Sequence, residues 1–248
     1  MPDNPTAAPP GNADLVATFL QNVRGATPLS IEQIDIMLQL LSAARGSAIE
    51  NFLDLGCGDG MLSSAILDEF PNARGCLVDI SDTLLTAARH QLHSHLDRVD
   101  FIVADYTQPG WAKTVARFSP FDAVVSAFAA HGSPDHQKRE LYTEIFQLLK
   151  PEGPFVNIEQ VASATRWTES IWDDYLIEAI FGPEIKGASG KKRIEVAREY
   201  YKRVNSGGNI CAPLEVQCDW LREIGFENVD CYLKVAELAV FGGQRPAA

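Results

Sequence analysis

The sequence predicts an α/β fold built on one open and mostly parallel sheet. From Ile49 onward, short apolar segments alternate with amphipathic segments, which is the pattern of consecutive β-α-β units. Near the C-terminus, two apolar segments follow each other with a very tight connection, which predicts an antiparallel hairpin. Together the two observations predict a doubly wound sheet of seven strands whose last strand is reversed.

The N-terminal part precedes this alternation. Residues 1–13 are rich in Pro, Ala and Asn, and we expect them to form a disordered tail. They have neither the basic start nor the apolar centre of a secretory signal. Apolar residues at helical spacing then predict one helix over Ala13–Arg24 and a second from Ser30 to about Arg45, so we assign 14–45 to N-terminal helices.

The alternating part divides into predicted elements in chain order. Strands are expected at Ile49–Leu55, Arg74–Asp79, Val99–Ala104, Phe121–Phe128, Pro154–Glu159, Phe226–Val235 and Glu237–Phe241. Helices are expected at Met61–Phe70, Asp82–His95, Trp111–Phe118, Pro134–Leu149 and Pro213–Ile224. In such folds ligands bind at the carboxyl ends of the parallel strands, so the residues that follow each strand are the candidates for a site.

One long segment, about 164–208, interrupts the alternation after the fifth predicted strand. Its pattern is helical and rich in aromatic residues, so we expect an inserted helical lid over the carboxyl edge of the sheet. No internal repeat and no linker divides the remainder. The prediction is therefore a single domain over 14–248 that carries this insertion.

The composition limits the partners that the chain is expected to bind. The formal net charge of −12 argues against nucleic acid, because contacts to phosphates need clustered Lys and Arg. The chain has no run of about 18 apolar residues, so no membrane-spanning helix is predicted. A small molecule is the expected partner, and no feature of the sequence specifies an oligomer.

The five cysteines predict neither a disulfide framework nor a metal site. Their number is odd, and no two of them form a C-x-x-C pair. The five histidines also lack the spacing of metal ligands, so no metal is expected. Reduced thiols fit a cytoplasmic protein.

The stretch NFLDLGCGDGML, residues 51–62, is the strongest indication of a ligand site. Gly56, Gly58 and Gly60 stand at alternate positions directly after a predicted strand. Backbone without a Cβ can adopt a positive φ and can approach a ligand closely. The helix that follows offers unpaired N–H groups at its first turn, so the pattern predicts a binding loop.

The residues beside the glycines indicate which ligand this loop suits. A dinucleotide fingerprint needs a glycine at the position that Met61 occupies, so that class of ligand does not match. Asp54 and Asp59 instead favour a ligand with positive charge, such as an ammonium or a sulfonium group. The structural alternative is that Asp54 only caps the turn by accepting backbone N–H bonds.

Three further strand ends carry residues that suit an adenosine. Asp79 ends the second predicted strand, where an acid can accept hydrogen bonds from ribose hydroxyls. After the third strand, Asp105 is a candidate acceptor for an adenine amine, although it can equally be a helix cap. Residues that would flank the base or form a small platform are Ala104, Tyr106, Ser126, Ala127 and Phe128. Tyr106 has ordinary packing as its alternative.

Together these residues resemble the first four motifs of class I S-adenosylmethionine-dependent methyltransferases. The motifs are DLGCGDG (54–60), Asp79, Asp105 and FDAVVSAFAAHG (121–132). LLKPEGPFVNIE (148–159) and the part from Trp220 onward are similar to the same family. The branch that the chain most resembles acts on small molecules and on the tRNA wobble base. The resemblance covers roughly Ile49 to the C-terminus apart from the insertion.

The resemblance implies a Rossmann-like fold with S-adenosyl-L-methionine as cofactor. It implies that the three glycines approach the methionine part of the cofactor, Asp79 the ribose and Asp105 the adenine. Cys57 lies inside the glycine motif and Ile80 follows Asp79, and both are expected to line the same site.

The acceptor side of the site is less specific. The related branch often reads H-H-L after the fourth strand, whereas this chain has Ala130-His131-Gly132 and keeps one histidine. His131 is either a general base or a structural histidine, and Glu159 is the second catalytic candidate. Candidate substrate contacts are His131, Gln160, Trp167, Trp172 and Tyr175. For these three aromatic residues, core packing is the structural alternative.

The reaction implied is transfer of a methyl group to a small-molecule acceptor by in-line displacement, for which alignment supplies most of the catalysis. The alternative is attack on the aminocarboxypropyl chain, by cyclisation or elimination, with release of methylthioadenosine. An NAD-dependent oxidoreductase and a non-catalytic cofactor-binding module are the other classes considered.

Overall fold

The computed structural model describes residues 29–45, 49–175 and 210–248. The predicted tail over 1–13 and the first predicted helix lie outside these ranges, as does most of the predicted lid. Among the helices of the described ranges, none is long and apolar enough to cross a membrane.

The described chain forms one seven-stranded sheet in the order β3-β2-β1-β4-β5-β7-β6. The first five strands are parallel to one another, and β7 runs antiparallel to both of its neighbours. This confirms the predicted mixed sheet with its reversed last strand. The strands are β1 (Asn51–Leu55), β2 (Arg74–Asp79), β3 (Val99–Val103), β4 (Ala123–Ala127), β5 (Pro154–Gln160), β6 (Glu227–Val235) and β7 (Leu238–Gln244).

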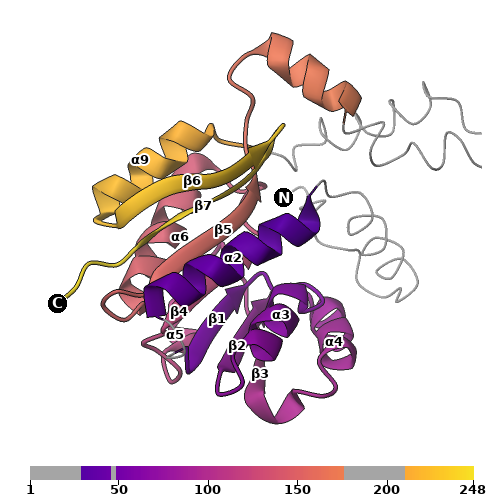
Figure 1. The fold of residues 1–248 in the computed structure, drawn as a ribbon, viewed down its shortest axis with the longest axis vertical. Coiled ribbons are helices and arrows are strands. Elements are labelled where there is room, and N and C mark those ends of the chain that lie inside the picture. Colours follow the sequence, from indigo (N-terminus) through magenta and orange to yellow (C-terminus); the bar gives the residue numbers. More distant parts are fainter. Residues whose placement is uncertain (1–28, 46–48, 176–209) are drawn as a thin grey trace, which may run out of the picture.

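Helices cover both faces of the sheet, as Figure 1 shows. One face carries α2 (Ser30–Arg45), α3 (Met61–Glu69) and α4 (Asp82–Gln91). The other carries α5 (Ala112–Val115), α6 (Asp135–Leu148) and α9 (Leu214–Ile224). Successive β1 side chains point to opposite faces, so that Phe52 packs beneath the first group of helices and Leu53 beneath the second. The layers therefore bury two apolar cores.

The largest difference from the predicted boundaries concerns the helix expected over Asp82–His95. α4 ends at Gln91, and a 3₁₀ turn, η2 (Leu96–Arg98), precedes β3. In the connection that replaces its last turn, the Arg98 guanidinium donates to the carbonyl oxygens of Leu67 and Pro71 and contacts the His95 ring. These bonds hold the connection between α4 and β3 against the end of α3.

At the amino edge of the sheet, one buried carboxylate joins three segments. Asp122 accepts from the Arg45 guanidinium at 2.7 Å and from the Lys150 ammonium at 2.9 Å. Its other oxygen accepts from the backbone N–H of Asn51 at 2.9 Å. These partners lower the pKa of Asp122 even though burial alone would raise it. This cluster fixes the start of β1 and β4 and lies at the edge opposite the strand ends that were predicted to bind ligand.

A helix at 166–175 follows β5 and stands clear of the strands in Figure 1. It is the described beginning of the segment predicted as a lid. Residues 176–209 lie outside the description.

Candidate active site

The glycine turn connects β1 to α3 and is held against β2. Gly56, Gly58 and Gly60 all have positive φ, at 69°, 57° and 83°. The N–H groups of Gly56 and Cys57 both donate to the Val78 carbonyl oxygen. The Cys57 side chain is buried. The turn is thus anchored through backbone bonds and needs residues that accept a left-handed conformation.

The three glycines are required for different reasons. A Cβ on Gly56 would lie 2.6 Å from the Cβ of Ala129, and one on Gly60 would lie 2.9 Å from Leu92. A Cβ on Gly58 would meet no atom within 4 Å. Gly56 and Gly60 therefore permit close packing of the turn, whereas Gly58 borders open space in which a ligand can approach the backbone.

Asp79 ties the end of β2 to this turn. Its Oδ2 accepts from the Gly58 N–H at 2.9 Å and its Oδ1 from the Ser81 N–H at 2.8 Å. Burial raises the pKa of the Asp79 carboxyl, although these backbone bonds favour its charged form. Asp79 thus has a structural task besides the ribose contact predicted for it.

Asp54 is a buried acid that the described residues only partly satisfy. The Ser63 hydroxyl donates to its Oδ2 at 2.6 Å, while its Oδ1 has no hydrogen-bond partner within the described ranges. Burial raises the pKa of Asp54 to about 7. An orphaned, buried carboxylate oxygen beside an open glycine turn fits a ligand that brings a positive charge or a hydrogen-bond donor.

The ends of β2 and β3 form the part of the site predicted for the adenosine. Asp105 accepts with Oδ1 from the Thr107 N–H at 3.0 Å and from the Thr107 hydroxyl at 2.6 Å. These bonds close a turn, and the next helix begins only at Ala112, so Asp105 is not a helix cap and its contact with adenine stays a prediction. Ile80 and Val103 are apolar side chains that remain 43% and 54% exposed at these two ends. Exposed apolar groups beside acids suit a flat, partly polar ring.

The end of β4, where the sequence predicts a small-residue platform, is joined to β1. Ser126 is buried, and its hydroxyl donates to the Leu55 carbonyl oxygen at 2.9 Å, which links β4 to β1. Phe128 has a φ of 53°, and this turn directs the chain toward Ala129 and Ala130. Because Ala129 packs on Gly56, the loop after β4 lies directly against the glycine turn.

His131 and Glu159, the two predicted catalytic residues, contact each other. The His131 Nδ1 lies 3.0 Å from Glu159 Oε1. The Ala130 N–H donates to Glu159 Oε2 at 2.8 Å, and the Gln160 N–H donates to Oε1 at 2.9 Å. Burial disfavours a charged imidazole, but the charge and hydrogen bond of Glu159 outweigh it and raise the pKa of His131.

Tyr106 lies between the glycine turn and the loop that carries His131. Its hydroxyl is 3.1 Å from the position that a Cβ on Gly56 would occupy. Burial, followed by the charges of Asp79 and Glu159, raises the pKa of Tyr106, so the phenol stays protonated. Tyr106 thus presents a neutral hydroxyl at the junction of the glycine turn and the His131 loop.

The predicted aromatic contacts lie on the helix at 166–175. Trp172 packs edge-on against Tyr175 with ring centroids 6.2 Å apart, and Trp167 is largely exposed. The contacts of the described residues do not bring these rings onto His131. Their role at an acceptor stays a prediction, as does that of the Gln160 side chain.

Two residues of the site escaped the sequence prediction. Ser63 holds Asp54, and its signal was a small polar residue three positions beyond Gly60, in the first turn of a helix. Val103 pairs with Asp79 across the two strands, and an apolar residue at a predicted strand end could have identified it.

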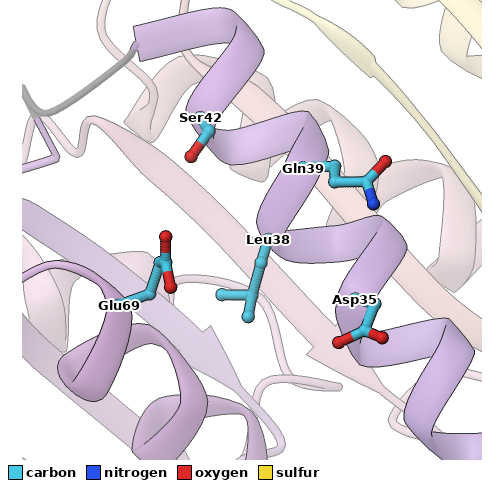
Figure 2. Close-up of a pocket in the computed structure, with 5 residues that line it drawn as sticks. All are labelled: Asp35, Leu38, Gln39, Ser42 and Glu69. Carbon is cyan, nitrogen blue, oxygen red and sulfur yellow. The ribbon is translucent and has the colours of Figure 1, made fainter.

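A pocket of about 250 Å³ lies elsewhere, between α2 and the end of α3 (Figure 2). It is lined by Asp35, Leu38, Gln39, Ser42 and Glu69. Glu69 ends the helix that begins at the glycine turn, so this pocket lies away from the carboxyl ends of the strands. It shares no residue with the site described above, and we assign it no role.

Comparison with known proteins matches residues 52–153 to a family model described as a methyltransferase domain. The match extends from β1 past α6 and contains the glycine turn, Asp79, Asp105 and His131. A curated relative, malonyl-[acyl-carrier protein] O-methyltransferase 1 of Ilyobacter polytropus, is 40% identical over 187 residues, which are 74% of this chain and 60% of the relative. Over the matched residues the chain thus resembles methyltransferases in sequence.

Another curated relative has a lower sequence identity to this chain. Trans-aconitate 2-methyltransferase of Acidovorax sp. (strain JS42) is 28% identical over 151 residues, which are 57% of this chain and 54% of the relative. The matches thus span 54% and 60% of the length of these two curated relatives. A solved O-methyltransferase family protein from Burkholderia thailandensis has the same fold, with a TM-score of 0.69 at 18% identity over 96% of this chain and 61% of that one.

Proposed function

We propose that the chain transfers a methyl group from S-adenosylmethionine to a small-molecule acceptor that arrives with a proton on its nucleophilic atom, such as a hydroxyl group. The observation that carries this proposal is the contact between His131 and Glu159, placed against the glycine turn through Ala129. An acceptor that is already an anion needs no base, whereas a hydroxyl must lose its proton as it attacks.

The cofactor side of the proposal rests on the residues around the glycine turn. The open side of Gly58 and the unsatisfied oxygen of Asp54 would take the methionine part, and the ends of β2 and β3 would take the adenosine. When bound, S-adenosylmethionine supplies a methyl group on a positively charged sulfur, with a neutral thioether as leaving group. Asp79, Ile80 and Asp105 keep the roles predicted for them.

On the acceptor side, His131 acts as the general base and Glu159 orients it. Because Nδ1 faces Glu159, Nε2 is the ring nitrogen that takes the acceptor proton. Glu159 stabilises the imidazolium that results, which is a role its complete burial strengthens. Positioning of the acceptor supplies the larger part of the catalysis.

A carboxylate acceptor is the second candidate, because two relatives are named for trans-aconitate and malonyl-[acyl-carrier protein] methylation. In that case a protonated His131 would hold the carboxylate instead of removing a proton. The pH dependence separates the two. Activity that rises with pH through the pKa of His131 supports its role as a general base. Activity that falls over this range supports a protonated His131 that holds a carboxylate.

The test is product analysis with methyl-labelled S-adenosylmethionine and a panel of phenols, aliphatic alcohols and carboxylic acids. Formation of S-adenosylhomocysteine together with a labelled phenol or alcohol supports the proposal. Methylthioadenosine would instead support the alternative attack on the aminocarboxypropyl chain. Binding of the nucleoside without any product would indicate a non-catalytic module.

The remaining expectations accompany this proposal. Residues 14–248 act as one methyltransferase domain, with 164–208 contributing to the acceptor side. The cytoplasm is the proposed compartment, since all five cysteines are unpaired thiols.

A further inference from the structure

Lys138 on α6 is a buried cation near the candidate base. It is only 1% exposed, although its helix has an exposed face on which a lysine would normally lie. Its ammonium donates to the carbonyl oxygens of Ser133 and Ile210. Asp135, one turn earlier, lies 3.6 Å away. A buried ammonium is costly unless its donors are used, so this position is specified by those partners.

These partners belong to two segments that meet at His131. Ser133 is in the loop that follows β4, and Ile210 leads toward α9. The Ile210 N–H donates to the His131 carbonyl oxygen at 2.8 Å. The Ser133 N–H donates to the Ala130 carbonyl oxygen at 3.0 Å, and the Ala130 N–H donates to Glu159. The Lys138 ammonium therefore closes a ring of hydrogen bonds around the backbone of His131.

The charged and titratable groups around this ring come from several elements. Glu159 of β5 faces both His131 and Lys138, Asp135 lies on the same helix as Lys138, and Cys211 follows Ile210. Tyr106, beyond β3, faces Glu159. The positive charge of Lys138 opposes protonation of His131, while Glu159 favours it and has the larger effect.

We propose that Lys138 is a positioning residue, which fixes the loop from Ala130 to Ser133 and thereby holds His131 in contact with Glu159. The inference rests on the proposed function, in which His131 is the base. An apolar side chain at this position would leave two carbonyl oxygens without their donor and would release the loop.

The experiment compares Lys138→Met with wild type in the full chain by NMR titration of ¹⁵N-labelled histidines. His131→Gln identifies the resonance. If the loop is released, the contact with Glu159 weakens, and the pKa of His131 falls by roughly half a unit or more toward its ordinary value. If Lys138 acted only through its charge, removing it would raise that pKa. A rise or no change overturns the proposal.

Lys150→Met is the matched control, because Lys150 also pairs with buried oxygen but at the opposite edge of the sheet. It should leave the His131 titration unchanged, and an equal fall in this control overturns the proposal. Should Lys138→Met fail to fold, Lys138→Gln retains a neutral donor and is expected to give a smaller fall.

Amide hydrogen exchange of wild type gives a readout that needs no variant. The proposal requires a protected Ile210 amide, and exchange at the rate of an unstructured amide overturns it. None of these measurements uses an acceptor. If His131→Gln retained full methyl transfer, the proposal that His131 is the general base would be wrong. The titration would still decide whether Lys138 positions the loop.

Discussion

His131 Nδ1 lies 3.0 Å from Oε1 of Glu159, a carboxylate with no exposed surface. Parallel pairing of β4 with β5 places the two residues together, because each follows or ends one of these adjacent strands. The two backbone N–H groups that also bind Glu159 fix both of its oxygens. A histidine oriented in this way is suited to accept a proton at its other nitrogen.

His131→Gln should reduce methyl transfer by about 10²–10⁴-fold, because general-base catalysis typically contributes that much. The affinity for S-adenosylmethionine should stay within about twofold, since the acids and glycines proposed to bind the cofactor lie at the ends of β1, β2 and β3. Initial rates and calorimetric titration measure the two effects. His136→Gln is the control, because His136 is an exposed histidine on α6. A rate equal to wild type in His131→Gln would contradict the assignment.

Glu159→Gln should lower the pKa of His131, because it removes the charge that favours the imidazolium. The raised pKa of His131 also determines how the stability of the folded protein depends on pH. A histidine whose pKa is raised in the folded state stabilises the protein below its unfolded pKa, near 6.5, and loses that contribution as pH rises through the folded value. Wild type should therefore lose stability with rising pH in this range more steeply than His131→Gln, measured by denaturant unfolding. Parallel pH dependences would contradict the contact.

The fold was predictable from the sequence because short apolar strands alternate with amphipathic helices. Each of these elements can be recognised from the residues of its own segment, without knowledge of the contacts between segments. The acids at the strand ends were predictable for the same reason. The hold of Ser63 on Asp54 and the burial of Lys138 were not, because a serine or a lysine on a helix resembles a solvent-facing residue. Lys138 meets Ile210 across 72 residues, a contact that only the packing of α6 creates.

Gly56→Ala and Gly58→Ala should separate packing from ligand approach. Both positions have positive φ, which costs an alanine about 1–2 kcal/mol. Gly56→Ala adds a collision with Ala129, so it should lower the unfolding free energy by roughly 2–4 kcal/mol in total. The methyl group of Gly58→Ala meets no protein atom, so this variant should lower the unfolding free energy only by the cost of its positive φ.

Cofactor affinity should show a different pattern in this pair of variants. The methyl group of Gly58→Ala occupies the open side of the turn. In this variant the loss of binding free energy for S-adenosylmethionine should therefore exceed the loss of unfolding free energy. Denaturant unfolding and calorimetric titration provide the two measurements. Wild-type affinity in Gly58→Ala would contradict the idea that a ligand approaches the turn from that side.

Asp54→Asn should stabilise the unliganded protein while weakening cofactor binding. The pKa of Asp54 is raised to about 7 in the folded state from an ordinary 3.8. Between these values the folded state holds a proton that the unfolded state has lost, so Asp54 makes stability fall as pH rises through this window. An asparagine has no charge to bury. Its variant should therefore match wild type near pH 4 and exceed it by about 1–3 kcal/mol at pH 8.

Binding should change in the opposite direction, since a ligand with positive charge favours the ionised carboxylate. Wild type should release protons when S-adenosylmethionine binds at pH 6, detected as a dependence of the calorimetric enthalpy on the ionisation enthalpy of the buffer. Asp54→Asn should bind more weakly and release fewer protons. Asp219→Asn, an exposed acid on α9, should change neither property. Equal affinity in Asp54→Asn and wild type would show that the unsatisfied oxygen of Asp54 does not face the cofactor.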